Sequence, residues 1–283
     1  MQARTWYGID FSGNYRKWSP GCRTSNVWVA RAEGQPDALT LRSLDRVQDL
    51  EGEDHPFSRL LLLLKRGHFT AACIDAQLSV PSVFVPDARH AALLDCVAGL
   101  PLTPEAQPFP SGPQLVSALT TTDELVEALA RNPKPLRRTE CYWHERGLSV
   151  RSAMWAGSRP GAPMCAAALK LVSELRGQLW PWKRSGPSLV GESFPMAQLL
   201  TWKLPRVGYG KSTEKARKLR EDIVAQLKMR IELGPFEALA VDHPDALDAV
   251  ICALSATGLP HEDLLQSPPE AEAEVEGWIA VVK

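Results

Sequence analysis

The chain lacks a long apolar run, a paired-cysteine motif and an excess of charge of either sign. Its longest leucine run, Leu60–Leu64, is followed at once by Lys65 and Arg66, and it falls far short of the ~18 apolar residues that indicate a membrane span. Six cysteines stand apart without CxxC spacing, which indicates reduced thiols instead of a disulfide framework. Because 32 Lys and Arg residues balance 33 Asp and Glu residues, nucleic-acid binding would have to rely on a local basic patch.

The rest of the composition is typical of a soluble globular protein. Apolar residues make up 45% of the 283 residues and charged residues 23%, so the chain is long and apolar enough to bury a real core. The first six residues contain no apolar signal core, and we therefore expect a cytoplasmic protein with no membrane association. We expect a single domain over residues 1–283.

Apolar patterning predicts an alternation of strands and helices. Strands are predicted at residues 4–10, 26–32, 38–44, 69–75, 188–193 and 277–282. Helices are predicted at residues 57–66, 87–98, 114–131, 163–179, about 213–233 and 244–257. This order predicts an α/β fold whose mixed sheet, three antiparallel strands and then parallel strands, is flanked by helices. Residues 100–187, which begin with a proline-rich loop at 101–113, are predicted to form a helical, loop-rich insertion.

Three acidic residues close short apolar runs of the predicted sheet. They are Asp10, Asp75 and Glu192. If their strands run parallel, these side chains leave the sheet at the same carboxyl edge, where open α/β sheets bind ligands. Neighbouring strands lie ~4.8 Å apart, which is close enough for two carboxylates to share a cation. An Asx turn or a helix cap explains Asp10 taken alone about as well, and Glu192 is either a ligand or a plain loop acid.

Two further acids, Asp245 and Asp248, lie three residues apart on the last predicted long helix. Residues at this spacing face the same side of a helix, and two like charges there destabilise it unless a cation compensates. The positive end of the helix dipole would account for Asp245. It accounts less well for Asp248, which lies deeper among apolar residues. The simplest use for such a set of acids is to hold Mg²⁺ or Mn²⁺ against a phosphate.

The densest basic stretch lies at the start of the helix predicted near residue 213. Its candidate nucleic-acid-binding residues are Lys203, Arg206, Lys211, Lys215 and Lys218. A helix N-terminus favours phosphate, and cations strengthen that preference, although an ordinary solvated helix face explains the pattern nearly as well. Five tryptophans stand among cations in the middle third of the chain and could stack on bases. We favour the simpler interpretation that most of them anchor the core or loops.

Four segments carry a family resemblance: GIDFSG at 8–13, CIDAQLSVP at 73–81, GESFPMAQLL at 191–200 and HPDALDAVICALSA at 243–256. Together they resemble a bacterial domain-of-unknown-function family of predicted nucleases with a ribonuclease-H-like fold. The segment DALDAVICA is similar to the final acidic helix of RuvC-type Holliday-junction resolvases, and the closing GWIAVV also fits the family. The resemblance implies a central first strand and catalytic acids at Asp10, Asp75 and the Asp245/Asp248 pair, with Glu192 as a further member.

These observations predict a metal-dependent nuclease that hydrolyses nucleic-acid phosphodiesters by a two-metal mechanism. Asp10 is then the best candidate to bridge both cations. Two alternatives stay open: an actin- or sugar-kinase-like ATPase on the same core fold, for which GIDFSGN would be a phosphate-facing turn, and a non-catalytic nucleic-acid-binding module. A P-loop is disfavoured because the segment that ends in Gly210-Lys211-Ser212-Thr213 has Pro205 where the pattern requires glycine.

Overall fold

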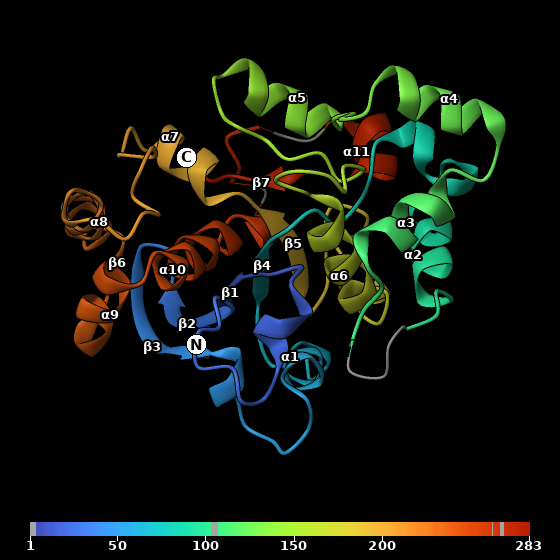
Figure 1. Cartoon of the computed structure of the whole chain (residues 1–283). Coiled ribbons are helices and arrows are strands. Elements are labelled where there is room, and N and C mark those ends of the chain that lie inside the picture. Colours follow the sequence, from blue (N-terminus) through green and yellow to red (C-terminus); the bar gives the residue numbers. More distant parts are fainter. Residues whose placement is uncertain (1–3, 103–106, 262, 267–268) are drawn as a thin grey trace.

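The computed structural model describes residues 4–102, 107–261, 263–266 and 269–283. Within them the chain forms one seven-stranded sheet with the order β6-β3-β2-β1-β4-β5-β7 (Figure 1). The strands are β1 (Thr5–Asp10), β2 (Trp28–Gln35), β3 (Ala38–Arg46), β4 (Ala71–Asp75), β5 (Leu189–Ser193), β6 (Ile231–Glu232) and β7 (Ile279–Ala280).

The pairing confirms a mixed sheet. Strands β1, β2 and β3 pair antiparallel, in chain order. Strand β4 lies parallel on the other side of β1, and β5 and β7 continue in parallel beyond it. The two-residue strand β6 pairs parallel with β3. The predicted start of three antiparallel strands followed by parallel strands is therefore confirmed.

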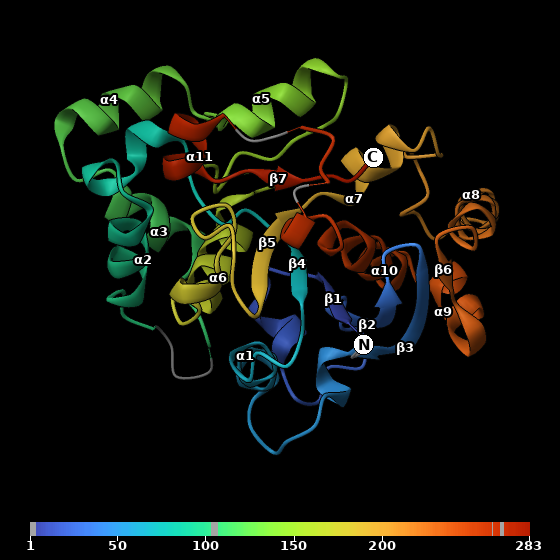
Figure 2. The ribbon, with the colours of Figure 1, turned by 180° about the vertical axis from the view of Figure 1, so that it is seen from behind.

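Helices cover both faces of the sheet (Figures 1 and 2). They are α1 (Pro56–Lys65), α2 (His90–Ala98), α3 (Gly112–Leu119), α4 (Asp123–Arg131), α5 (Arg138–Glu145), α6 (Ala162–Val172), α7 (Pro195–Thr201), α8 (Glu214–Leu227), α9 (Glu237–Asp242), α10 (Pro244–Ala256) and α11 (Glu270–Glu276). No helix in the described part of the chain combines the length and the apolar character needed to cross a bilayer.

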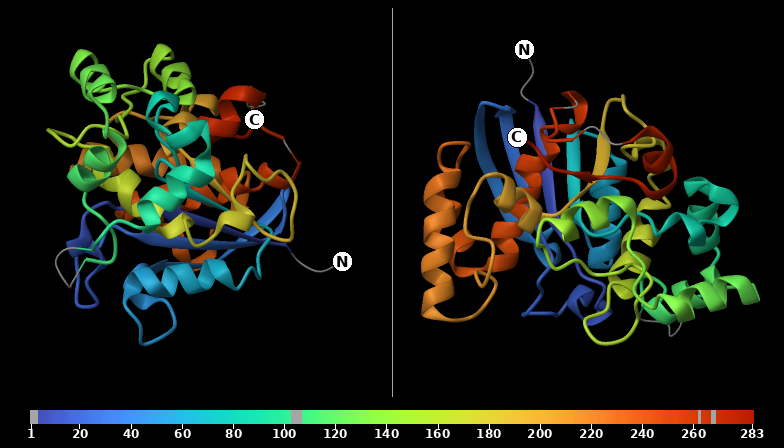
Figure 3. Two further views of the ribbon diagram at one scale, coloured as in Figure 1. Left: turned by 90° about the vertical axis from the view of Figure 1, so that its right-hand side faces the viewer. Right: turned by 90° about the horizontal axis from the view of Figure 1, so that it is seen from above.

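The sheet separates two apolar cores, and the alternation of side chains along each strand assigns residues to one or the other. On one face, Trp6 and Cys73 pack with helices α8, α9 and α10. On the other face, Ile9 and Ile74 pack with helices α1, α2, α3 and α6. The right-hand view of Figure 3 shows the strands between these two groups of helices. The fold therefore has three layers, and strand β1 lies inside the middle one.

Several predicted boundaries were wrong. The helix predicted at 114–131 is two helices, because Thr120 ends α3 and the Thr122 side chain caps α4. The helix predicted to reach about residue 233 ends at Leu227, because the chain then turns to pair as β6. Helices α5, α9 and α11 had no predicted counterpart. In region 100–187 the structure places α3 to α6, while residues 103–106 of the proline-rich loop lie outside the described residues.

Candidate metal centre

The first two acids of the site are brought together by strand register. Asp10 is the last residue of β1 and Asp75 the last of β4, and the two are direct partners in the parallel pair. Alternation along both strands turns them to the face that carries α10, because Gly8 and Cys73 precede them by two residues on that face. The predicted meeting of Asp10 and Asp75 at one sheet edge is confirmed.

Helix α10 reaches the same edge because it lies unusually close to β1. A Cβ atom on Gly8 would be 2.0 Å from the carbonyl oxygen of Ala249 and 2.1 Å from the amide nitrogen of Ala253. Only glycine allows this approach of helix backbone to strand. The close packing of α10 places Asp248 beside the carboxyl ends of β1 and β4.

Three carboxylates converge as a result. Asp10, Asp75 and Asp248 each offer an oxygen, and these oxygens all lie within 4.8 Å of one another. Asp10 is buried, with 6% of its surface exposed, and the other two are partly buried. Asp245 lines the same cavity one turn earlier on α10, outside this group of three. We refer to Asp10, Asp75 and Asp248 as the acidic triad; it could hold a metal ion.

Burial and mutual repulsion make the charged form of these acids costly. Burial, followed by the charges of Asp245, Asp248 and Asp75, raises the pKa of Asp10 well above its usual range. Burial and the charge of Glu192 raise the pKa of Asp75 to about 7, against an opposing effect of Arg151. Burial and Asp75 also raise the pKa of Asp248. A bound cation would relieve this repulsion, so the electrostatics favour metal binding.

Tyr209 orients the third member of the triad, and sequence reasoning missed it. Its hydroxyl donates a hydrogen bond of 2.7 Å to Oδ1 of Asp248. The buried Arg220 fixes the Tyr209 segment, because its guanidinium donates to the carbonyl oxygens of Tyr209, Lys211 and Val241. Tyr209 belongs to the glycine-containing segment whose sequence resembles the end of a P-loop. The Thr213 side chain in that segment caps α8 instead.

Glu192 lies in the same cavity but is engaged elsewhere. It pairs across β5 and β4 with Ile74, one residue before Asp75, so alternation turns it to the opposite face from the triad. There the fully buried Arg137 binds it through two hydrogen bonds of 2.7 and 2.5 Å, and the amide of Leu78 donates a third of 3.0 Å. Arg137 also pairs with buried Glu140 at 3.0 Å. Glu192 therefore joins β5 to the segment before α5.

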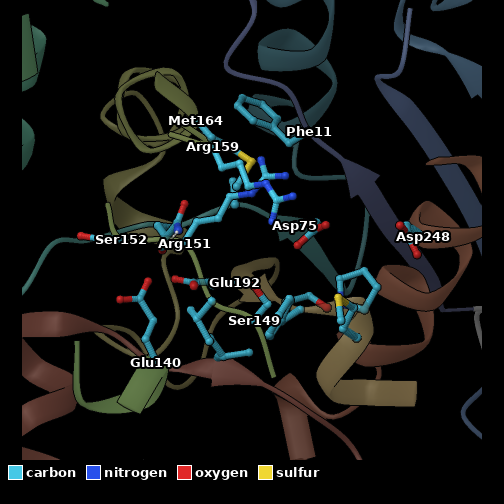
Figure 4. A pocket seen from close by; sticks show the side chains of 18 of the residues that line it. Phe11, Asp75, Glu140, Ser149, Arg151, Ser152, Arg159, Met164, Glu192 and Asp248 are labelled. Carbon is cyan, nitrogen blue, oxygen red and sulfur yellow. Dashed lines mark hydrogen bonds between the residues drawn. The ribbon is translucent and has the colours of Figure 1, made fainter. Parts of the chain in front are cut away.

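The acids line one wall of a cavity of about 910 Å³, and cations line another. The cationic wall comes from the middle of the chain and consists of Lys134, Arg151 and Arg159. In Figure 4 the side chains of Arg151 and Arg159 extend toward Asp75. We call these three residues the basic wall. Sequence reasoning missed them, although it noted that tryptophans stand among cations in this part of the chain.

The basic residues predicted to bind nucleic acid lie outside this cavity lining. Lys203, Lys211, Lys215 and Lys218 are exposed and Arg206 is partly buried, around α7 and α8. Their role remains a prediction. Among the tryptophans, Trp143 and Trp180 are buried, as the simpler interpretation expected, whereas Trp155 lines the cavity.

Comparison with known proteins identifies the chain at the level of a family. No curated protein matches it, and no solved structure does. A family model described as "Protein of unknown function (DUF429)" matches residues 8–274, a span that includes the acidic triad, Tyr209 and the basic wall. The chain therefore belongs to this family of proteins of unknown function.

Proposed function

We propose that the protein is a Mg²⁺- or Mn²⁺-dependent nuclease of ribonuclease-H-like fold that hydrolyses nucleic-acid phosphodiester bonds. The observation that carries this proposal is the acidic triad: carboxylates from two neighbouring parallel strands and one helix, with oxygens within 4.8 Å of one another, in the wall of a cavity. Carboxylates at this density are a common solution for holding divalent cations next to a phosphate.

The residues fit such a cation in chemistry as well as in position. All three donors are carboxylate oxygens, which hard cations such as Mg²⁺ and Mn²⁺ prefer. The pKa of each is raised by burial and by its acidic neighbours, and a bound cation would favour their charged forms. The ribonuclease-H-like part of the proposal is supported by the position of β1, which pairs antiparallel with β2 on one side and parallel with β4 on the other.

The roles of the residues follow from their places. Divalent cations, when bound, would lower the pKa of a water nucleophile and neutralise the charge that develops on the leaving oxygen. Asp10, most buried of the three and flanked by both others, is suited to bridge two cations. Asp75 and Asp248 would hold one each, with Asp245 assisting from the same helix. Tyr209 keeps Asp248 in one orientation through its hydrogen bond.

The test is cleavage of labelled DNA and RNA in Mg²⁺ or Mn²⁺. We expect Asp10→Asn and Asp248→Asn to lower the rate at least 100-fold, because each removes a cation ligand. The matched control is Asp242→Asn, an exposed acid just before α10 whose partner is Arg217; it should cut like the parent. If the two site variants cut as well as the parent, the assignment of the site is wrong.

The same panel separates the alternatives. A nucleic-acid-binding module would retard labelled strands on a gel without metal and yield no products. A sugar-kinase-like ATPase would be stabilised against heat by nucleotide. The turn that such an ATPase would use is filled by protein here, because a Cβ on Gly13 would meet the backbone of Pro163 and Met164 at 2.3 Å. This packing favours the nuclease.

A further inference from the structure

The cavity of the acidic triad has a second, oppositely charged side, the basic wall. Arg151 and Arg159 are exposed, and no carboxylate in the described part of the chain forms an ion pair with either. Arg151 acts on the site electrostatically, because its charge opposes the rise in the pKa of Asp75. Two guanidinium groups facing a metal centre are suited to hold an anion against it.

Hydrogen bonds hold the segments that carry the basic wall in place beside the acidic triad. The side-chain amide of Gln77, two residues after Asp75, donates to the carbonyl oxygen of Arg151 at 2.8 Å. The Ser152 hydroxyl donates to the carbonyl oxygen of Pro135 at 2.6 Å, and the amides of Gly161 and Ala162 both donate to that of Trp155. Arg151 is therefore positioned by the same strand end that positions Asp75.

Polar groups that lack partners also line the cavity. Gln77 is 6% exposed, and its Oε1 has no hydrogen-bond partner among the described residues. The buried Oδ1 of Asn26 also has no hydrogen-bond partner among the described residues. Both residues line the cavity. Burial of an acceptor without a donor is costly, so the cavity wall contains two acceptors that the described residues leave unsatisfied.

An aromatic ring adjoins the basic wall. Trp155 lines the cavity, and the ammonium group of Lys134 lies over its ring, 4.7 Å from the centroid. Phe11 and Phe194 line the cavity as well. Cations that follow a phosphate backbone, interleaved with rings on which bases stack, are the general means of binding single-stranded nucleic acid.

The size of the cavity discriminates against a double helix. A sphere of 910 Å³ is about 12 Å across. The two grooves of B-DNA, which open on opposite sides of the duplex, are together about 16 Å deep, so the duplex is wider than this cavity. Asp10 is buried at the cavity wall, so the scissile phosphate has to enter. One strand with its bases unpaired can enter as a whole, whereas a duplex could present only the phosphates on its outer surface.

We propose that the cavity binds a single-stranded polynucleotide, with a phosphate held between the acidic triad and the pair Arg151 and Arg159 and a base stacked on Trp155. This inference rests on the proposed function for the identity of the polymer. It assigns substrate recognition to the basic wall, in place of the lysines on α8.

The test measures binding separately from cleavage. Asp10→Asn protein in Mg²⁺ is titrated into fluorescent single-stranded DNA, single-stranded RNA and a duplex of the same sequence, with anisotropy as the readout. We expect each single strand, or one of the two, to bind at least tenfold more tightly than the duplex. Equal or tighter binding of the duplex, or binding to none of the three probes, overturns the proposal.

Variants locate the binding site. Adding Arg151→Ala and Arg159→Ala should weaken single-strand binding at least tenfold and reduce the slope of log K against log salt by about 0.7, since the pair holds one phosphate and each phosphate contact contributes ~0.7 for single strands. Replacing both by Lys should keep most of the salt slope, because the charge remains. The control, Lys215→Ala with Lys218→Ala, changes equally exposed cations on α8 and should change affinity less than twofold. The reverse pattern would place the strand on α8 and overturn the assignment.

The outcomes distinguish this inference from the proposed function. A protein that binds single strands through Arg151 and Arg159 but cuts nothing in Mg²⁺ or Mn²⁺ would refute the nuclease and leave the binding site standing. A protein that cuts duplexes in preference to single strands, with Asp10 essential, would confirm the nuclease and refute the single-strand site.

Discussion

The two walls of the cavity are built in different ways. The acidic triad stands on β1, β4 and α10, where backbone pairing and a glycine contact fix the carboxylates. The basic wall stands on the loops around residues 134 and 151–159, fixed by hydrogen bonds from single side chains such as Gln77 and Ser152. One wall depends on the regular fold, and the other on a few specific contacts. Substitutions at the basic wall should therefore reduce the stability of the fold much less than substitutions at the acidic triad.

The walls also differ in electrostatic state. The acids lie close together, and burial with mutual repulsion raises their pKa values. The arginines are exposed, so their charges cost little to keep. Bound metal ions would relieve the repulsion among the acids of the triad. A phosphate of an anionic substrate would then pair with the arginines of the basic wall.

The largest loss of stability is expected at Gly8, where β1 packs most closely against α10. Gly8→Ala would place a methyl group 2.0 Å from the carbonyl oxygen of Ala249, and helix backbone cannot move away cheaply. We expect a loss of more than about 4 kcal/mol in the free energy of unfolding, or no folded protein. Urea denaturation measures it. The control is Gly177→Ala, where nothing lies near the added Cβ; equal stability of the two variants would show that α10 does not depend on this contact.

The contrast between the walls also explains which residues sequence reasoning could find. Asp10 and Asp75 each end an apolar run, and parallel pairing with matching register brings them together. Glu192 ends a similar run, but β5 pairs one residue out of step with Asp75, so its side chain turns away. No local pattern reveals that register. Arg151, Arg159 and Tyr209 stand in segments without periodicity, where tertiary contacts alone decide direction.

The next largest effect is expected at the buried ion pairs of Arg137, which join β5 to the segment before α5. Arg137→Met would leave Glu192 and Glu140 buried without their partner, and loss of one member of a buried ion pair costs about 3–5 kcal/mol. Thermal and urea unfolding measure the loss. Arg89→Met is the control, since Arg89 and Asp87 form an exposed pair worth at most about 1 kcal/mol. Adding Glu192→Gln and Glu140→Gln should recover part of the stability; no recovery would mean that Arg137 acts through packing alone.

A smaller effect is expected from pH. The folded-state pKa of Asp75 is raised to about 7, above its unfolded value of about 3.9. Its protonated form therefore contributes stability below about pH 4, and that contribution is lost as pH rises through about 7. In metal-free protein, Asp75→Asn should become more stable than the parent by roughly 1–3 kcal/mol at pH 8, with little difference at pH 4.

Bound metal should reduce the loss of stability that follows when Asp75 becomes charged at high pH. Because cations bind the charged carboxylates, Mn²⁺ should stabilise the parent more at pH 8 than at pH 5 and should stabilise Asp75→Asn less. Melting curves at both pH values, with and without Mn²⁺, measure the difference. A difference between Asp75→Asn and the parent that is the same at every pH would show that the repulsion among the acids is not relieved by protonation of Asp75.

The smallest expected change in stability is that of Tyr209→Phe, which probes the hydrogen bond that orients Asp248. It removes the hydroxyl that donates to Asp248 but keeps the buried ring, so it should cost about 0.5–1.5 kcal/mol. Groups that orient a ligand typically change metal affinity about 10- to 100-fold, so the Mn²⁺ concentration for half-maximal stabilisation should rise by about tenfold. Tyr15→Phe, at a ring outside the cavity lining, should leave it unchanged. If Tyr209→Phe loses stability but keeps its metal affinity, Tyr209 packs the segment before α8 and does not orient Asp248 for metal.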